Sequence, residues 1–451
     1  MQPVKWLIAA PPDFEAELRQ ALTKRLSKAR QENRSELPFM GAAALYFHPV
    51  ARPFSAQVRV QFNFPEAFHN LGRPLLRDRL WHWAGLTHFQ EMPEAIDRIT
   101  FVGHRPIDVR RYHRGQWEPL IHSLRSRQAV RTALTAAYAL GFDAACVTVG
   151  ENGGRSMPID LSPLPPKTLW PLFCDAVAEE ILEALGVGVS EEDVQFGADI
   201  ELVITKRDNQ LVAASDFLPF EGEIGCDRQT AAGQPHRHPL GELRPAPERS
   251  AVALMRNVWQ LVNRLSETLG EGYLLYGGSQ PAHALFAGGH LHLSGVRPTF
   301  SLLHRLDLYL ALPLLFLEDP ADGIARRRKY GRLGEFRIAA HDGFEYRTLP
   351  SFLTLPSVAL GVFVLFEWLV RHYRQLPPGG LVTSWQQQAF YTADTTVLLP
   401  VLCEIRQVLF NVWEDRSTWP LIEPLFSSVR GETPLLGGPL TGWVSPLPAK
   451  V

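Results

Sequence analysis

The chain has 451 residues, which is too long for one ordinary domain and predicts two or three. Hydrophobic residues make up 46% and charged residues 20%, so the chain can bury a core and is not disordered as a whole. A formal net charge of −2 argues against a protein held to nucleic acid by bulk charge. The four cysteines form no C-x-x-C pair, and four in 451 residues are too few for a disulfide scaffold, which predicts a reducing, cytoplasmic location.

Apolar stretches indicate buried helices and no membrane partner. The first residues, MQPVKWLIAAPPDFE, are typical of a strand and a turn and not of a signal peptide. The two most apolar stretches are Leu308–Leu317 and Leu355–Val370. Both are shorter than the ~20 apolar residues that a membrane-spanning helix needs.

Residues 1–185 are predicted to form a smaller α/β domain that precedes the main one. The first of its helices carries acids early and bases late, as the helix dipole favours. The expected helices are Pro11–Gln31, Arg125–Leu140 and Leu172–Leu185, and the expected strands are Gln57–Phe64 and Ala145–Val149.

Residues 190–451 are predicted to form an α+β domain with a mostly antiparallel sheet and flanking helices. Short strand-like segments follow one another without a steady strand–helix alternation: FGADIELVIT, QLVAAS, GELRP, HLHLSG and FEYRTL. The expected helices are Arg249–Leu269, Thr299–Leu317, Leu355–Arg374 and Thr395–Trp413.

Four of these strands share a pattern of two polar residues placed two apart. Residues i and i+2 of a strand point to the same face, so four such pairs could line one face of a sheet. A buried charged surface is costly unless a metal or a ligand neutralises it, which favours a binding site over a core. The pairs are Asp199 and Glu201, Glu242 and Arg244, His290 and His292, and Glu345 and Arg347.

The residue types on this surface indicate metal and phosphate chemistry. Three carboxylates with one imidazole suit Mg²⁺ or Mn²⁺, whereas structural zinc sites favour Cys and His. Arginine guanidinium groups match phosphate oxygens and carboxylates. The expected metal ligands are Glu201, Glu242, His290 and Glu345, and the arginines are Arg244, Arg337, Arg347 and the run Arg326–Arg328. Together they are the groups that phosphoryl transfer requires.

Each element of this pattern also has an ordinary structural interpretation. Glu345 and Arg347 taken alone would be half of a cross-strand ion pair, and an H-x-H pair is often two hydrogen-bonded histidines. Two other function classes therefore stay open. One is a metal-dependent amide hydrolase that uses His290 and His292, with His304 or His341 as further ligands. The other is a non-catalytic partner-binding protein.

The order of these motifs resembles the phage-type, or type 2, carboxylate–amine ligases over residues 196–355. The segments that carry the resemblance are GADIE, ELRP, GGHLHLSG, RRRKYGRLGEFR and FEYRTL. This family belongs to the amidoligases with a glutamine synthetase-like catalytic domain, in which a curved, mostly antiparallel sheet carries the site. The resemblance implies ATP-dependent formation of an amide or isopeptide bond through an acyl phosphate. The acid and the amine would be small molecules, peptides or proteins, without nucleic acid, and a homo-oligomer is compatible with it.

The resemblance also assigns roles. It implies that Glu201, Glu242, His290 and Glu345 bind the metal and that His292 contacts nucleotide phosphate or metal. Arg337 and Arg347 would contact the phosphates and the acyl phosphate, with Arg244, Arg326 and Arg328 as further nucleotide or substrate contacts. Asp199 and Asp227 match acids that bind metal or orient the amine. Arg228 stands where many relatives have glycine, and Ile200 where proline is common.

The first domain is similar to the closing half of an ATP-grasp domain. The similarity lies in Ile99–Arg110 and in the segment LGFDAACVTVGENGGRSMPIDLSPLP. The late acid-x-Asn motif of that fold appears only as Asp160 and Ser162, and no lysine lies between Lys28 and Lys167. We therefore expect a degenerate ATP-grasp-like domain without an ATP site of its own.

Overall fold

The computed structural model describes residues 5–31, 42–47, 49, 58–86, 92–120, 124–185, 194–231, 233–281, 285–339, 343–430 and 435–443. The chain divides into two compact units. Unit 1 comprises Met1–Val189 with two later segments, Pro298–His304 and Arg374–Gln387, and unit 2 comprises the remainder. The sequence placed those two segments in the second domain, together with everything after residue 190.

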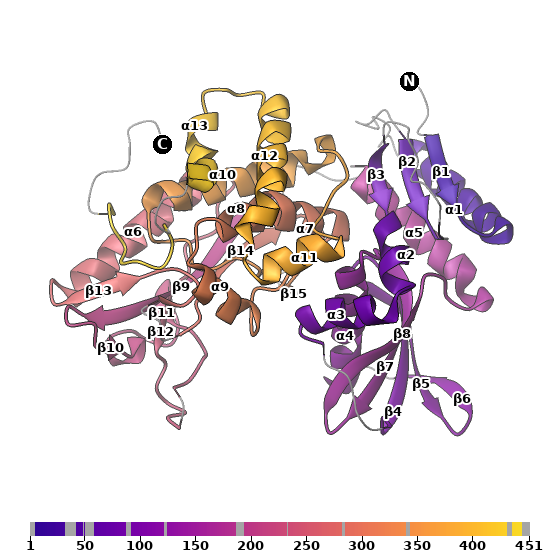
Figure 1. Ribbon diagram of the computed structural model, residues 1–451, viewed down its shortest axis with the longest axis horizontal. Helices are drawn as coiled ribbons and strands as arrows, with labels where there is room; N and C mark the ends of the chain where they lie inside the picture. Colours follow the sequence, from indigo (N-terminus) through magenta and orange to yellow (C-terminus); the bar gives the residue numbers. More distant parts are fainter. Residues whose placement is uncertain are drawn as a thin grey trace. The chain divides into compact units, whose positions relative to one another are not determined.

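Unit 1 contains two sheets (Figure 1). Parallel strands β1 (Lys5–Ala9), β2 (Ala42–Tyr46) and β3 (Val58–Phe62) form the first, in that order. Helices α1 (Pro12–Gln31) and α5 (Trp170–Ala184) pack against each other beside it, with Phe14 and Phe173 in a shared core. The expected helices and strands of this region are present.

The second sheet of unit 1 is antiparallel, with the order β6-β5-β4-β7-β8. Helix α4 (Leu124–Leu140) packs on β7 and β8, and α2 (Pro65–Leu71) and α3 (Pro74–Trp83) pack on α4. The strands are β4 (Ala95–Val102), β5 (Arg105–His113), β6 (Gln116–Pro119), β7 (Ala144–Asn152) and β8 (Arg155–Ser162).

Long-range contacts attach the two later segments to unit 1. The ring of His304 stacks on Tyr138 with 4.2 Å between the ring centroids. The Asn70 side chain donates to the carbonyl of Val382, and the Gln387 side chain donates to the carbonyl of Ala139. Contacts between residues so far apart in the chain leave no local pattern, which is why the sequence did not reveal this assignment.

Unit 2 is built on an eight-stranded sheet whose main path is β11-β12-β9-β14-β16-β15. Strands β10 and β13 also pair with β9, and every pairing in this sheet is antiparallel. The strands are β9 (Gln195–Lys206), β10 (Leu211–Val212), β11 (Ile224–Cys226), β12 (Leu240–Leu243), β13 (Tyr273–Tyr276), β14 (Gly289–Ser294), β15 (Phe336–Ile338) and β16 (Gly343–Tyr346). The expectation of mixed helices with mostly antiparallel strands is confirmed.

Three helices of the second half follow expected ranges: α6 (Ala251–Leu269), α10 (Pro356–His372) and α12 (Thr395–Val412). Three shorter helices, α9 (Pro320–Arg327), α11 (Ser384–Tyr391) and α13 (Trp419–Ile422), were not expected from the sequence. The helix expected over Thr299–Leu317 is divided into α7 (Phe300–Leu306), a π-helical turn (Asp307–Ala311) and α8 (Leu312–Leu315). Pro313 lacks an N–H group and so cannot make the regular helical hydrogen bond there.

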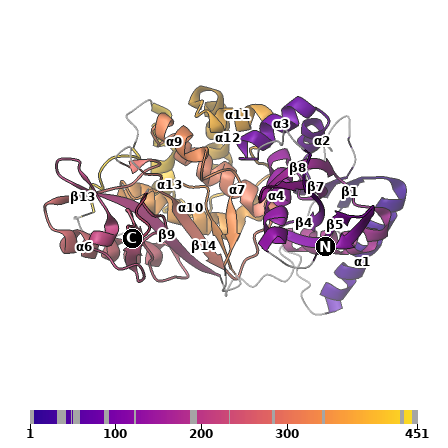
Figure 2. The same ribbon diagram turned by 90° about the horizontal axis from the view of Figure 1, so that it is seen from below.

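Alternation along the central strands separates an apolar face of the sheet from a polar one. Phe196 of β9 lies on the apolar face, where its ring contacts Phe366 of α10 at 5.7 Å between centroids. Leu291 and Leu293 of β14 are buried, as are Phe344 and Tyr346 of β16. Figure 2 shows α6 and α10 beside β9 and β14. Helices therefore cover the apolar face, and the acids and histidines lie on the other face.

Among the described helices, α12 has the length and apolar composition that a membrane span would need, which by itself is weak support for one. Its buried residues Leu398, Leu402, Ile405 and Leu409 recur at helical spacing, the pattern of a helix packed by one face on a protein core. Arg406 of the same helix donates to the carboxylate of Glu423. The stretches 308–317 and 355–370, expected to be buried helices, are helical and mostly buried.

Candidate functional site

A cavity of about 500 Å³ lies on the polar face of the unit 2 sheet. Nine of the twelve residues singled out from the sequence line it. From β9, β12 and the end of β11 come Asp199, Asp227, Glu242 and Arg244. From β14, β15 and β16 come His290, His292, Arg337, Glu345 and Arg347. Glu201, Arg326 and Arg328 are not part of its wall.

Strand register explains why these side chains meet. Asp199 of β9 lies opposite His290 of β14, and His292 of β14 lies opposite Glu345 of β16. Arg337 of β15 lies opposite Glu345 in turn. Directly opposed residues of antiparallel strands have Cβ atoms about 4.5–5.5 Å apart, so four neighbouring strands bring one compact charged group together.

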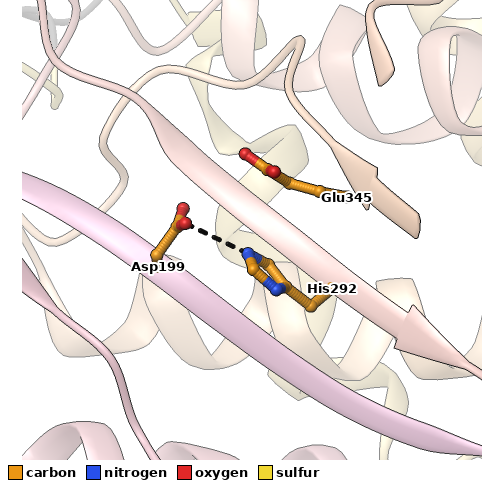
Figure 3. A group of neighbouring side chains, drawn as sticks. All are labelled: Asp199, His292 and Glu345. Carbon is orange, nitrogen blue, oxygen red and sulfur yellow. Dashed lines mark ion pairs between the residues drawn. The ribbon is translucent and has the colours of Figure 1, made fainter. Parts of the chain in front are cut away.

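Asp199, His290, His292 and Glu345 form the centre of this group. Nδ1 of His290 lies 2.6 Å from Oδ1 of Asp199 and 3.2 Å from Oε1 of Glu345. Nε2 of His292 lies 3.1 Å from Oδ2 of Asp199. Figure 3 shows Asp199, His292 and Glu345 projecting from their strands toward one another. All four side chains are mostly buried, so their charges act on one another through a poorly screened medium.

The central charges shift one another's pKa values in opposite directions. Burial raises the pKa of Asp199, but hydrogen bonds and positive charge from His290 and His292 outweigh burial and hold that pKa well below its usual range. Burial lowers the pKa of His290, but the hydrogen bond and negative charge of Asp199 raise it above its ordinary value. The pair is therefore held as carboxylate and imidazolium unless a cation replaces the proton.

Two further acids, Glu201 and Glu242, lie next to each other on neighbouring strands close to this centre. Glu201 of β9 is opposite Glu242 of β12. Burial raises the pKa of Glu201, and burial with the negative charge of Asp199 raises the pKa of Glu242 to about 8. Two adjacent buried carboxylates repel each other when both are ionised. One of them therefore tends to be protonated, unless a bound cation neutralises both charges.

Glu201 is oriented by the backbone of Gly288. Its Oε2 accepts the N–H of Gly288 at 2.6 Å, and its own N–H donates to the Gly288 carbonyl at 2.9 Å. A Cβ atom on residue 288 would fall on the ring of His290, so glycine is needed for the close approach of backbone and imidazole. Glu201 thus lies under the site and not on the cavity wall.

Three of the cavity arginines are paired with carboxylates of the same site. Arg337 lies 2.5 Å and Arg347 3.2 Å from Glu345. Arg244 pairs with Glu242 and also donates to the carbonyls of Gly222 and Cys226. Arg337 is 60% exposed while Glu345 is buried, so this guanidinium can leave the pair to reach a ligand.

The structure does not place Arg326 and Arg328 where a nucleotide contact would need them. Arg326 is buried, and its guanidinium donates to the backbone carbonyls of Thr348 and Leu349. Arg328 is exposed and lies off the cavity wall. The cause is the phase of α9, which turns residues 326 and 327 inward and 328 outward. Arg326 thus has a structural position and Arg328 a surface position, and neither lines the cavity.

The donor set at the centre fits a hard divalent cation. Asp199, His292 and Glu345 each offer one ligand atom, and these atoms lie within 4.8 Å of one another. Oδ1 of Asp199, Nε2 of His292 and Oε1 of Glu345 are buried and accept no hydrogen bond from any described backbone group. Two carboxylates and one imidazole are ligands that Mg²⁺ and Mn²⁺ accept. Of the four expected ligands, Glu345 belongs to this trio, His290 contacts it, and Glu201 and Glu242 lie outside it.

Several residues of the cavity wall carry no motif that singles them out. They are Phe220, Glu221, Gly222, Ile338 and Ala339. Glycine also has a role at residue 225, where a Cβ would collide with the Arg244 guanidinium. The double glycine before His290 is the one signal that could have pointed to a close backbone approach.

A comparison with curated protein sequences gives no match. Among solved structures, the chain is similar to a bifunctional glutathione synthetase from Pasteurella multocida, with 11% identity and a TM-score of 0.33. That similarity covers 55% of this chain and 48% of the synthetase, so the chain spans about half of that protein's length.

The family comparison covers the site itself. Residues 196–435 match the model described as "Phage phiEco32-like COOH.NH2 ligase-type 2". The match spans more than half of the chain and includes the strands that carry Asp199, Glu242, His290, His292 and Glu345. On this evidence the chain belongs to the phage phiEco32-like, type 2 carboxylate–amine ligase family.

Proposed function

We propose that the protein is an ATP- and divalent-cation-dependent ligase that joins a carboxylate to an amine. The observation that carries the proposal is the placing of Asp199, His292 and Glu345 beside the guanidinium groups of Arg337 and Arg347 in one cavity. Carboxylates and histidine for a cation, next to arginines for phosphate oxygens, are the groups needed to move a phosphoryl group.

Mg²⁺ or Mn²⁺ would be held by Asp199, His292 and Glu345, with His290 and Glu242 close enough to adjust the charge around it. When bound, the cation would neutralise phosphate charge. Because His290 contacts both Asp199 and Glu345, it orients two of the three ligands. Glu201 accepts a hydrogen bond from the Gly288 N–H and so helps to fix the backbone next to His290.

Arg337 and Arg347 would bind the phosphoryl group during its transfer. An oxygen of the acid substrate attacks the γ-phosphorus of ATP, ADP leaves, and an acyl phosphate forms. The amine nitrogen then attacks the acyl carbon, phosphate leaves, and the nitrogen gives up its proton to form the amide or isopeptide bond. Asp227, on the cavity wall away from Arg337, would orient the amine. The substrates belong to the amino acids, peptides or protein side chains.

A metal-dependent amide hydrolase is the weaker candidate. It would need ligands beyond His290 and His292. His304 belongs to unit 1, where its ring packs between Tyr138 and Phe64, and His341 lies outside the described residues. The paired arginines beside Glu345 have no obvious use in metal-assisted hydrolysis. A non-catalytic protein is disfavoured by the survival of costly buried charges.

Unit 1 has a supporting part in this proposal. Asp160 and Ser162 are exposed on β8, and we assign this unit no ATP site of its own. As a degenerate ATP-grasp-like unit it would recognise the amine or a protein partner. We expect the enzyme to act in the cytoplasm, without nucleic acid or membrane, and a homo-oligomer is compatible with the proposal.

Phosphate release from ATP by the purified chain tests the function. Pairs from a panel of acids and amines are supplied with Mg²⁺, and each product is identified by mass spectrometry. Release that needs both substrates, with a product mass equal to acid plus amine minus water, supports a ligase. Amide cleavage without nucleotide would favour the hydrolase. If the chain shows neither activity, a non-catalytic binding protein would be favoured.

A further inference from the structure

One arginine of the cavity differs from the others in having no partner among the residues that the structure describes. Arg228 lines the wall and is exposed. No ion pair or hydrogen bond joins its guanidinium to any residue that the structure describes, whereas Arg244, Arg337 and Arg347 are each paired with a carboxylate of the site. An arginine already neutralised by a neighbour binds an incoming anion less favourably than an unpaired one, so Arg228 is the cation best able to receive a substrate anion.

Two acids of the same cavity also lack a cationic partner among the described residues. Asp227 precedes Arg228 in the chain, and Glu221 lines the cavity from the segment before β11. Asp227 is fixed from below, since its N–H donates to the Leu240 carbonyl and its Oδ1 accepts the N–H of Gln229. Neither Asp227 nor Glu221 forms an ion pair with a described residue. Among its described residues the cavity therefore offers an unpaired positive charge together with unpaired negative charges.

Arg228 comes from a different strand than the arginines of the proposed phosphate site. Asp227 and Arg228 follow β11, and Glu345 lies on β16, in the order β11-β12-β9-β14-β16. Both groups line the same cavity of about 500 Å³, so an amine held at Asp227 and Arg228 lies in the cavity where phosphoryl transfer takes place. The arginines that serve phosphate in the proposed function are at the β16 end, which leaves Arg228 for another anion.

We propose that Asp227, Glu221 and Arg228 form the amine subsite, and that the amine substrate is a zwitterion whose amino group has a carboxylate close by, as in a free amino acid. The acids bind the amino group and Arg228 binds the carboxylate. This assignment rests on the proposed ligase function and narrows its amine substrate: an amine without a neighbouring carboxylate leaves Arg228 unused.

Calorimetric binding to the full chain, loaded with ADP and Mg²⁺, tests the subsite without turnover. The probes are the twenty common amino acids, each compared with its own amide, in which the carboxylate charge is removed. We expect at least one amino acid to bind about tenfold or more tighter than its amide, as one charge-assisted contact allows. Arg228→Gln should abolish this preference and Arg228→Lys should keep part of it.

A matched control and a charge reversal make the result specific. Arg237→Gln removes an exposed arginine nearby in the chain that pairs with Asp216 and does not line the cavity, so it should leave the preference unchanged. Arg228→Glu should favour 1,5-diaminopentane over L-lysine. The inference is overturned if no amino acid binds tighter than its amide, or if Arg228→Gln keeps the wild-type preference. Failure of the ligase function would show separately, as no phosphate release with any acid and amine.

Discussion

Replacing Glu345 by glutamine removes one charge from the centre of the site while keeping the shape of the side chain. Glu345 is buried and lies within ion-pair distance of His290, Arg337 and Arg347. Breaking a fully buried pair costs ~3–5 kcal/mol. Arg337 is 60% and Arg347 27% exposed, so both can regain water, and we expect a loss of only about 1–3 kcal/mol.

Activity should fall far more than stability. Removal of one preorganised charged group from a site of this kind lowers turnover by about 10²–10³-fold. For a unit of 150–250 residues, 1 kcal/mol moves the unfolding temperature by roughly 2–4 °C, so Glu345→Gln should unfold about 2–12 °C below the wild type. Thermal unfolding, together with ATP-dependent phosphate release measured well below the transition temperature, separates the two effects.

Glu318→Gln is the matched control. Glu318 is also a buried glutamate of unit 2, bonded to Arg327 and Ser279, but it does not line the cavity. Because both members of its ion pair are buried, we expect it to lose about 3–5 kcal/mol of stability and little activity while folded. A folded Glu345→Gln variant with full activity, or equal loss of activity in the two variants, would refute the role given to Glu345.

Three other predictions follow from the same contacts. Gly288→Ala should displace His290 and lower phosphate release at least tenfold, whereas Gly272→Ala, which has open space around it, should not. The pKa of Glu242 is raised from 4.5 to about 8, so its contribution to the stability of the metal-free protein is full below pH 4.5 and is lost as pH rises toward 8. Mn²⁺ should therefore raise the unfolding temperature more at pH 9 than at pH 6, and equal shifts would contradict this. Arg326→Gln should destabilise the fold by ~1–3 kcal/mol yet leave the KM for ATP unchanged, and a raised KM would return Arg326 to the site.

Alternation along the strands was the most reliable signal in the sequence. Asp199 and Glu201, like His290 and His292, had to share a face because the side-chain period of a strand is fixed. Strand order and register could not be read in the same way. Nothing local indicates that Asp199 lies opposite His290, and this pairing makes Asp199 a better candidate ligand than Glu201.

Composition was the least reliable signal. The run at residues 326–328 looked like a phosphate-binding group, but helix α9 turns Arg326 toward backbone carbonyls and Arg328 toward water. The phase of a short helix is set by its tertiary packing, which three adjacent arginines do not disclose. Arg228 was noticed only as a departure from its relatives, because its lack of a partner is a property of three-dimensional structure.

The location of a bound Mn²⁺ ion is the most direct test of the account. Crystals grown with MnCl₂ would be examined by anomalous scattering at a wavelength where manganese contributes. We predict a peak about 2.0–2.2 Å from one atom each of Asp199, His292 and Glu345. A peak elsewhere in the molecule, or none at this trio when the ion is saturating, would contradict the proposal that these three strands form a cation site.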